Sequence, residues 1–284
     1  MTEKGRPKIT ICIPHWQVKK YISICLRSIR KHSQKYDIQV IVVDNGSKDE
    51  SLDYLRALDW ILLLERPGEV HTNWPRNVFT AWDHGLQHAA GDFYVTMHSD
   101  VFVKADDWLD PMLREIRADP NIAAAGAWKL HIENPVYAFQ KRATRYLVKK
   151  MRQLAGAKKP VEWRIGHYPR DYCAMYRREP IIANKLQFTP IREAGGALAS
   201  GGGYSIATQI WNAGYETRMV PVDEMRSKVA HIAHGTAAVR EEKPLRHKRK
   251  QKKLEARTAR FLNQQWIREL EFDDCLDRKK DAAL

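Results

Sequence analysis

One carboxylate stands directly after a predicted inner strand, where it could bind a ligand or a metal ion. Residues 93–97 form a short apolar run typical of a buried strand, and His98-Ser99-Asp100 follows it. Open α/β sheets bind their ligands at the carboxyl ends of the strands, so Asp100 is a candidate metal ligand or ligand-orienting group. Asp is also favoured at helix N-caps and in turns, and a purely structural role for Asp100 is the alternative.

Other polar residues follow the remaining predicted strands and would converge on the same crevice. Pro14, His15 and Trp16 follow the first strand, Asp44 follows the second, and Arg76 opens a later helix. Asp44 can accept hydrogen bonds from a base or a ribose, and Arg76 can pair with phosphate through two parallel hydrogen bonds. The crevice could therefore hold a nucleotide.

A divalent cation would fit beside such a nucleotide. One or two protein carboxylates plus phosphate oxygens commonly hold the ion, and Asp100 offers one carboxylate. His231 and His234 follow the last predicted core strand, and an imidazole could complete the coordination shell of Mn²⁺ or a similar ion. A hydrogen-bonding role at the surface or in the core is the alternative for either histidine.

The elements that must position these residues alternate between strand and helix over roughly the first 120 residues. Apolar runs predict strands at residues 8–14, 38–43, 60–64 and 93–97. The helical period predicts helices at residues 21–31, 77–89 and 108–117. The spacing of Ser47 and Glu50 matches a capping box and predicts another helix that begins there. This alternation indicates an α/β fold with a doubly wound, mostly parallel sheet.

The second half of the chain is less regular. Residues 141–154 predict a basic amphipathic helix, suited either to a membrane surface or to packing at the rim of the domain. Later elements are predicted as two strands and a helix between them, at residues 173–176, 205–212 and 219–222. A terminal helix that contains Phe261, Leu262 and Trp266 is expected to dock on the core.

These elements predict one main domain and an extension. We expect the domain to span residues 1–236, with a nucleotide-binding half (1–104) and an acceptor half (105–236). Residues 237–284 are expected to form a basic α-helical C-terminal extension.

The net charge of +14, from 48 Lys and Arg against 34 Asp and Glu, is concentrated in two segments. Residues 140–160 hold eight Lys or Arg and no acidic residue, and residues 240–260 hold ten Lys or Arg with three Glu. Such segments favour a polyanionic partner, either anionic lipid head groups or nucleic acid. A solvated helix face is the alternative for each segment.

Composition also bears on location. No apolar run approaches the roughly 20 residues that span a bilayer, and the N-terminus does not have the pattern of a signal peptide. Cys12, Cys25, Cys173 and Cys275 are widely spaced and form no metal-binding motif. We therefore expect free thiols and a cytoplasmic protein.

A series of short motifs runs through the chain, and the series is more specific than any single member. The motifs are Ile13-Pro14, Cys25-Leu26-Arg27-Ser28, Val43-Asp44-Asn45-Gly46-Ser47, Pro75-Arg76-Asn77, Gly91-Asp92-Phe93, His98-Ser99-Asp100, Ala174-Met175-Tyr176-Arg177-Arg178-Glu179, Gly214-Tyr215 and His231-Ile232-Ala233-His234-Gly235-Thr236. Between residues 8 and 235 this series resembles the family-2 glycosyltransferases, which have the GT-A fold.

The resemblance implies a nucleotide-sugar donor (a UDP- or GDP-sugar), a divalent Mn²⁺ or Mg²⁺ ion, and inversion at the anomeric carbon. It also implies that Asp100 binds the metal, with His231 as the first choice of metal-binding histidine and His234 as the second. The residues implied in donor binding are Pro14, His15, Trp16, Asp44, Arg76, Ser99 and Asp100. The metal would neutralise the leaving diphosphate, and a carboxylate base would deprotonate the acceptor hydroxyl.

Two positions depart from the family pattern. His98 replaces the first Asp of the D-x-D motif, while the second, metal-binding Asp100 is kept. The family's catalytic carboxylate is expected where this chain has Gly202-Gly203. Glu193 on the same loop is the first candidate to replace it, and Asp171 is the second. A base supplied differently, a retaining reaction, or no activity are the remaining alternatives.

We therefore expect a glycosyltransferase of the hexosyltransferase type that acts on a cell-surface glycan or a lipid-linked acceptor, from a peripheral position at the inner membrane face. Modified DNA of the phage type is the alternative acceptor, because the same basic segments would follow phosphates. A non-catalytic sugar-nucleotide or polyanion-binding protein on a degenerate GT-A fold is a third hypothesis, supported by the glycine pair at the position of the base.

Overall fold

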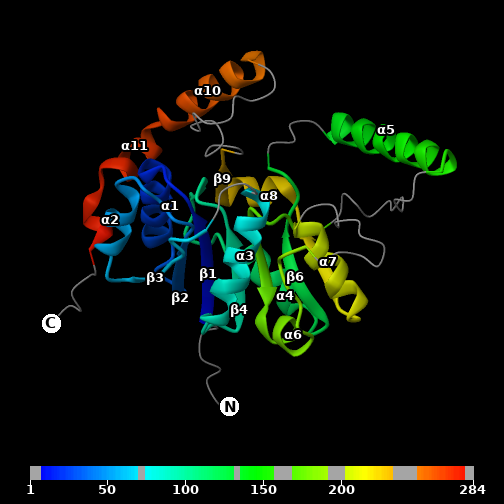
Figure 1. Ribbon diagram of the computed structural model, residues 1–284, viewed down its shortest axis with the longest axis horizontal. Helices are drawn as coiled ribbons and strands as arrows, with labels where there is room; N and C mark the ends of the chain where they lie inside the picture. Colours follow the sequence, from blue (N-terminus) through cyan, green and yellow to red (C-terminus); the bar gives the residue numbers. More distant parts are fainter. Residues whose placement is uncertain are drawn as a thin grey trace.

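A seven-stranded sheet forms the centre of the molecule, with the strand order β3-β2-β1-β4-β7-β6-β8 (Figure 1). The computed structural model describes residues 8–69, 74–130, 135–156, 168–190, 202–232 and 248–278 of the 284-residue chain. The strands of this sheet are β1 (Lys8–His15), β2 (Asp37–Asp44), β3 (Ile61–Glu65), β4 (Phe93–Met97), β6 (Ile122–Ala127), β7 (Cys173–Arg177) and β8 (Glu216–Val220). Only β7 runs antiparallel to its neighbours β4 and β6 among these strands, so the expected mostly parallel α/β sheet is confirmed.

Helices cover both faces of the sheet (Figure 1). They are α1 (Lys19–His32), α2 (Ser51–Arg56), α3 (Trp74–Gln87), α4 (Asp110–Arg117), α5 (Pro135–Leu154), α6 (Arg178–Ala183), α7 (Gly202–Asn212), α8 (Val222–Lys228), α10 (Lys248–Leu262) and α11 (Gln265–Phe272). Alternate residues of β2 point to opposite faces. Val40 and Val42 pack in the core that α1, α4 and α11 cover, and Ile41 and Val43 pack in the core under α3 and α7.

A second, two-stranded sheet stands at the carboxyl ends of the central strands. It pairs β5 (Val101–Val103) with β9 (Val229–His231) in antiparallel register. The sequence pattern predicted neither β9 nor β6. Strand β9 has only three residues, and the sequence of β6, IAAAGA, is poor in the β-branched residues that strands favour.

The predicted helix start at Ser47 is wrong. Helix α2 begins at Ser51, and no side chain caps its first turn. The backbone N–H of Gln17 donates to the Ser47 hydroxyl over 2.8 Å, while that hydroxyl itself donates to the Asp44 carboxylate. Ser47 therefore closes the loop after β2 rather than starting a helix.

Gly91 allows the close approach that sets β4 beside β1. A Cβ atom at this position would lie 2.6 Å from the backbone nitrogen of Thr10 and 2.8 Å from the carbonyl oxygen of Lys8. The N–H of Gly91 donates to the Thr10 hydroxyl over 2.9 Å. A residue without a side chain is required here, which accounts for the glycine of the Gly91-Asp92-Phe93 motif.

The single terminal helix predicted around Phe261, Leu262 and Trp266 is in fact two helices, α10 and α11, which break at Asn263 and Gln264, but the predicted docking on the core is present. Phe261, Leu262 and Trp266 are partly buried against the core. Arg27 of α1 donates two hydrogen bonds to the Asp277 carboxylate, at 2.9 and 2.6 Å, and ties the end of the described chain to α1. The Tyr54 hydroxyl donates to the same carboxylate over 2.8 Å.

Helix α5 lies apart from the sheet and its covering helices (Figure 1). The amphipathic helix predicted at residues 141–154 is present. Its apolar side does not pack at the rim of the domain, so that one of its two predicted roles is wrong. Leu147, Met151 and Leu154 are 57, 69 and 82 % exposed. Within the described residues, no helix combines the length and apolar character needed to cross a bilayer.

Candidate metal and donor site

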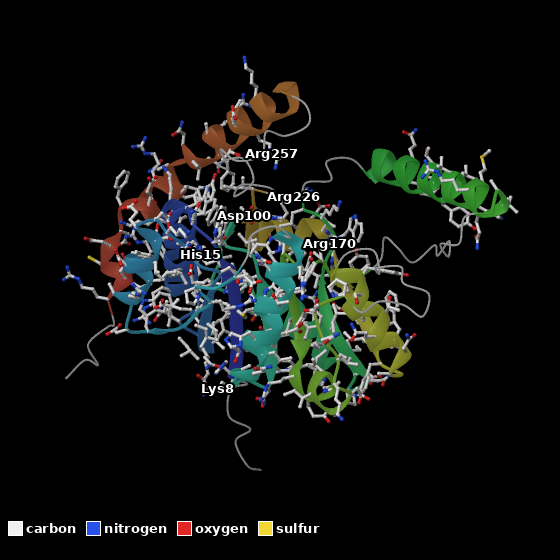
Figure 2. All side chains as sticks on the ribbon, in the orientation of Figure 1. Lys8, His15, Asp100, Arg170, Arg226 and Arg257 are labelled. Atoms are coloured by element: carbon white, nitrogen blue, oxygen red, sulfur yellow. The ribbon has the colours of Figure 1, made fainter. Side chains whose placement is uncertain are left out.

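Three side chains that can ligate a metal ion come together at the carboxyl end of β4. They are His98, Asp100 and His231, and one ligand atom from each lies within 4.8 Å of the others. The Asp100 Oδ1 atom is 3.4 Å from Nε2 of His231 and 3.9 Å from Nδ1 of His98. Asp100 is only 4 % exposed and lies at the top of the sheet, as Figure 2 shows.

Backbone pairing brings these three residues together from distant parts of the chain. Val101, the first residue of β5, pairs with His231, the last residue of β9. The N–H of Ile232 donates to the Asp100 carbonyl over 3.1 Å, and the N–H of His98 donates to the Tyr172 carbonyl over 3.0 Å. The cluster is therefore built on strand ends rather than on long loops.

Aromatic side chains fix the orientation of both imidazoles. Trp82 stacks on His98 with 5.6 Å between ring centroids and 22° between planes, and Tyr172 stacks on His231 at 4.8 Å and 16°. Trp82 donates from its indole to the Cys12 carbonyl over 3.2 Å, and Tyr172 donates to the Trp128 carbonyl over 3.0 Å. Each ring is thus held by a partner that is itself fixed to the backbone.

The chemistry of the cluster fits a divalent metal ion. Nδ1 of His98 and Nε2 of His231 are the ring nitrogens near the Asp100 carboxylate, so two imidazoles and one carboxylate could share an ion. Burial lowers the pKa of His98, against the opposing charges of Asp171 and Asp100, and favours the neutral imidazole that binds metals. Two imidazoles with one carboxylate suit Mn²⁺ and related transition ions, whereas Mg²⁺ prefers oxygen ligands.

His98 is the site residue that the sequence analysis missed as a ligand. It was treated as the loss of the first Asp of D-x-D, yet it lies in the cluster with Asp100 and His231. Its residue type was the signal, since histidine is itself a common metal ligand. Of the predicted metal residues, Asp100 and His231 come together, and His234 lies outside the described residues.

A buried thiol of α1 lies beside the cluster. The Cys25 thiol lies 3.9 Å from the His98 carbonyl oxygen. Burial raises the pKa of Cys25 well above its usual value, with smaller contributions from Asp100 and Cys173. Among the described residues Cys12, Cys25 and Cys173 are buried free thiols and Cys275 is an exposed one, as the sequence predicted.

Asp44 and His15 lie side by side at the ends of β2 and β1. Asp44 is 1 % exposed and accepts hydrogen bonds from the backbone N–H groups of Gly46 and Ser47, at 3.0 and 2.9 Å. Nε2 of His15 is 2.8 Å from the Ser51 hydroxyl. Burial lowers the pKa of His15 to about 4, although Asp44 and Asp49 act against it. Both side chains shape the loop after β2, and their contact with a donor stays a prediction.

The other predicted donor residues lie around this crevice. Pro14 ends β1 with His15, and Trp16 follows as a buried residue. Arg76 is exposed in the first turn of α3, and Ser99 is partly buried within the His98-Ser99-Asp100 turn. The structure places them at strand ends and at a helix start, and contact with a donor remains a prediction for these residues as well.

Asp171 lies against the position where a catalytic carboxylate was expected. A Cβ atom on Gly203, the second residue of α7, would be 3.3 Å from Cγ of Asp171. Oδ1 of Asp171 is 3.7 Å from Nη2 of Arg170, and its charge acts on His98. The second candidate base therefore lies against the glycine pair, and its charge acts on the cluster of His98, Asp100 and His231, called the metal-type cluster below. Glu193, the first candidate, lies outside the described residues.

The mixed, mostly parallel seven-stranded sheet, with one carboxylate and two imidazoles gathered at its strand ends, makes this a GT-A-type α/β protein. Residues 10–183 match the model of the family described as "Glycosyl transferase family 2". The chain belongs to this family.

Relatives and solved structures agree with this assignment. A mannosyltransferase from Pyrobaculum calidifontis, solved with GDP-Man and Mn²⁺, matches with a TM-score of 0.53 and 18 % identity, over 94 % of this chain and 74 % of that one. A mycobacterial protein matches with a TM-score of 0.50 and 17 % identity, over 89 and 72 %. At these identities the likeness concerns the fold.

A curated relative matches over a shorter region. The dolichyl N-acetyl-alpha-D-glucosaminyl phosphate 3-beta-D-2,3-diacetamido-2,3-dideoxy-beta-D-glucuronosyltransferase of Methanococcus voltae is 25 % identical over 122 residues. The match covers 42 % of this chain and 38 % of that protein. The chain therefore aligns with well under half of this relative.

We expect Mn²⁺ to bind the cluster in the absence of any nucleotide. Electron paramagnetic resonance of free Mn²⁺ should show binding by the full chain, its loss in Asp100→Ala, and weakening by about tenfold or more in His98→Asn. His88→Asn removes an exposed histidine and serves as the matched control. Unchanged Mn²⁺ binding in His98→Asn would show that His98 is not a ligand.

Proposed function

We propose that the protein is a metal-dependent glycosyltransferase that moves a hexose from a UDP- or GDP-sugar to a hydroxyl of a lipid-linked or cell-surface glycan, with inversion. The observation that carries this proposal is the cluster of His98, Asp100 and His231 at the strand ends of a family-2 domain. The Pyrobaculum neighbour was solved with GDP-Man and Mn²⁺, and the name of the Methanococcus relative describes a lipid-linked phosphate acceptor.

Separate groups of residues in this chain would bind the ion and the donor. His98, Asp100 and His231 would hold a divalent ion, which would neutralise the negative charge that develops on the leaving diphosphate. Asp44 and the loop that it closes would receive the base or the ribose at the end of β2. Trp82 and Tyr172 would keep the two imidazoles in position through each reaction cycle.

We assign the base to Asp171. The acceptor hydroxyl would attack the anomeric carbon, its proton would pass to the Asp171 carboxylate, and the bond from that carbon to the diphosphate oxygen would break. Two observations support this assignment: the carboxyl group lies against Gly203, where the family's base was expected, and its charge reaches His98. Glu193 remains the other candidate from the sequence.

Helix α5 supports a peripheral position on an anionic membrane. It holds six Lys or Arg and no acidic residue, and its described apolar residues Phe139, Leu147, Met151 and Leu154 are exposed. A bilayer surface satisfies both features, because lipid head groups attract the cations and the acyl boundary accepts the apolar side. Nucleic acid would use the cations and leave the apolar side in water, so the membrane is the better match.

Donor binding should depend on the metal. A thermal-shift screen with UDP- and GDP-sugars should raise the Tm by about 5 °C for at least one donor, at about 100 times its Kd, when Mn²⁺ is present. Asp100→Ala should remove this rise, and His88→Asn should keep it. A rise that survives in Asp100→Ala would contradict the role of Asp100.

Asp171→Asn should slow turnover without weakening donor binding. We expect Mn²⁺-dependent hydrolysis of the bound donor to fall by about 100-fold or more, because water loses its proton acceptor, while the donor-induced rise in Tm is kept. Glu193→Gln is the matched variant. Full activity in Asp171→Asn with loss in Glu193→Gln would transfer the role to Glu193.

Membrane binding should depend on the apolar side of α5. The protein should sediment with vesicles of phosphatidylglycerol and phosphatidylcholine, and the triple variant Leu147→Ser, Met151→Ser, Leu154→Ser should lose most of this binding. Ile182→Ser, at an exposed apolar residue of α6, is the control. Binding to duplex DNA with a steep salt dependence, and none to vesicles, would favour the nucleic-acid acceptor.

A further inference from the structure

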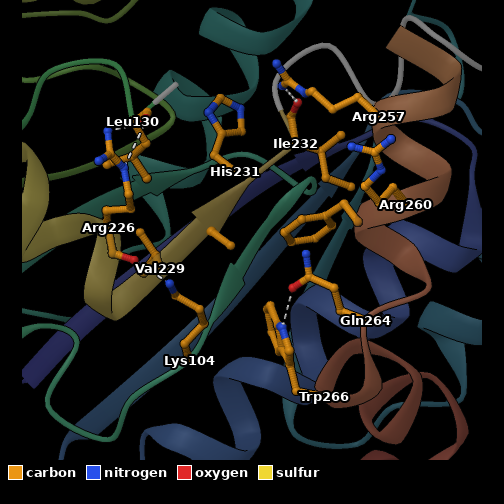
Figure 3. Close-up of a pocket in the computed structure, with 12 residues that line it drawn as sticks. Lys104, Leu130, Arg226, Val229, His231, Ile232, Arg257, Arg260, Gln264 and Trp266 are labelled. Atoms are coloured by element: carbon orange, nitrogen blue, oxygen red, sulfur yellow. Dashed lines mark hydrogen bonds between the residues drawn. The ribbon is translucent and has the colours of Figure 1, made fainter. Parts of the chain in front are cut away.

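A pocket of about 620 Å³ adjoins the metal-type cluster on the side of α10 (Figure 3). Strand β9 and the end of α8 form one wall, and α10 with the start of α11 forms the other. His231 lines the pocket as well as the cluster with His98 and Asp100. A molecule in the pocket would therefore lie next to any ion that the cluster held.

The charged lining of the pocket is cationic. Lys104, Arg226, Arg257 and Arg260 line it, and its described lining includes no Asp or Glu. Arg226 pairs with Asp223 at 2.8 Å, but the other three cations form no ion pair with any described carboxylate.

Basic side chains near the pocket that do not line it form ion pairs with carboxylates. Lys228 pairs with Asp107 at 2.5 Å, and Arg114 pairs with Glu224 at 2.8 Å. In the pocket, Lys104 donates instead to the carbonyl oxygen of Arg226, and Arg257 donates to that of Ile232. These bonds hold the side chains, and no described carboxylate pairs with Lys104 or Arg257. Burial, together with the charge of Arg226, lowers the pKa of Lys104, as expected for a cation that lacks an anion.

Apart from His231 and the amide of Gln264, the rest of the lining is apolar. Leu130, Val229, Ile232, Phe261 and Trp266 contribute side chains beside the cations. A small inorganic ion would leave these surfaces unused. The combination suits an amphiphilic anion, with a charged head near the arginines and an apolar segment against the aromatic rings.

We propose that this pocket binds the phosphate group of the acceptor substrate, a phosphate ester whose first apolar units lie against Phe261 and Trp266. This inference rests on the proposed glycosyl transfer and names the chemical class of the acceptor. In the view of Figure 2, Arg226 and Arg257 lie on the opposite side of Asp100 from His15, so donor and acceptor would approach the ion from two sides.

Calorimetry in the presence of EDTA tests the pocket apart from the metal site. The probes are inorganic phosphate, glucose 1-phosphate and geranyl phosphate below its micelle concentration. Wild-type protein should bind geranyl phosphate, and the double variant Arg257→Gln, Arg260→Gln should weaken binding by about tenfold or more. Arg257→Lys with Arg260→Lys keeps the charge and should restore part of the affinity, which separates loss of charge from loss of folding.

Lys252→Gln is the matched control, because it removes one exposed charge from the same helix outside the pocket. Its affinity for geranyl phosphate should stay within about twofold of wild type, well under the tenfold (1.4 kcal/mol) expected for the pocket variant. Tighter binding of geranyl phosphate than of glucose 1-phosphate supports a lipid source of the phosphate, and equal binding would contradict the proposed contact of apolar units with Phe261 and Trp266.

Three results would overturn the proposal. They are no binding of any probe to wild type, an equal loss of affinity in Lys252→Gln, and a loss of Mn²⁺-dependent donor binding in the double variant. The last result would indicate that the pocket binds the diphosphate of the donor instead of the acceptor. Because donor binding is measured separately, failure of the pocket is distinguishable from failure of the glycosyltransferase proposal.

Discussion

The pairing of β5 with β9 joins two halves of the site that are far apart in the sequence. Closing such a long loop costs conformational entropy, and a ladder of three residue pairs contributes little by itself. Packing of the two strands against the core supplies the rest of the free energy that holds β5 and β9 together. Val101, Phe102, Val103 and Val229 are fully buried, and the N–H of Val103 donates to the Ser28 hydroxyl of α1 over 2.9 Å.

The C-terminal helices belong to this support. Phe261 of α10 stacks on Phe102 of β5 with 5.9 Å between ring centroids. The extension therefore packs on the strand that directly follows Asp100. Arg27 fastens the end of the described chain to α1 through Asp277. A change at Asp277 would therefore act on the site through α1 and α11, without any contact with donor or acceptor.

The sequence predicted the parts of the fold that local pattern determines. Apolar runs located β1 to β4, and the strand-end rule placed Asp100 correctly. Strand β9, which like β5 has only three residues, was missed because three residues carry no period, and its partner is chosen by packing. The place of His98 beside Asp100 and His231 was not predicted, because histidine does not match the first Asp of the D-x-D motif. Asp171 ranked second because only the folded chain places it against Gly203.

The stacking of Trp82 and Tyr172 on the two histidines has a consequence for coordination number. An imidazole that is held between a strand end and an aromatic ring cannot swing away and let water take its place. If the cluster holds a divalent ion, the protein would supply at most three ligands from fixed positions. An ion that prefers six ligands would then have about three left for the oxygens of a diphosphate.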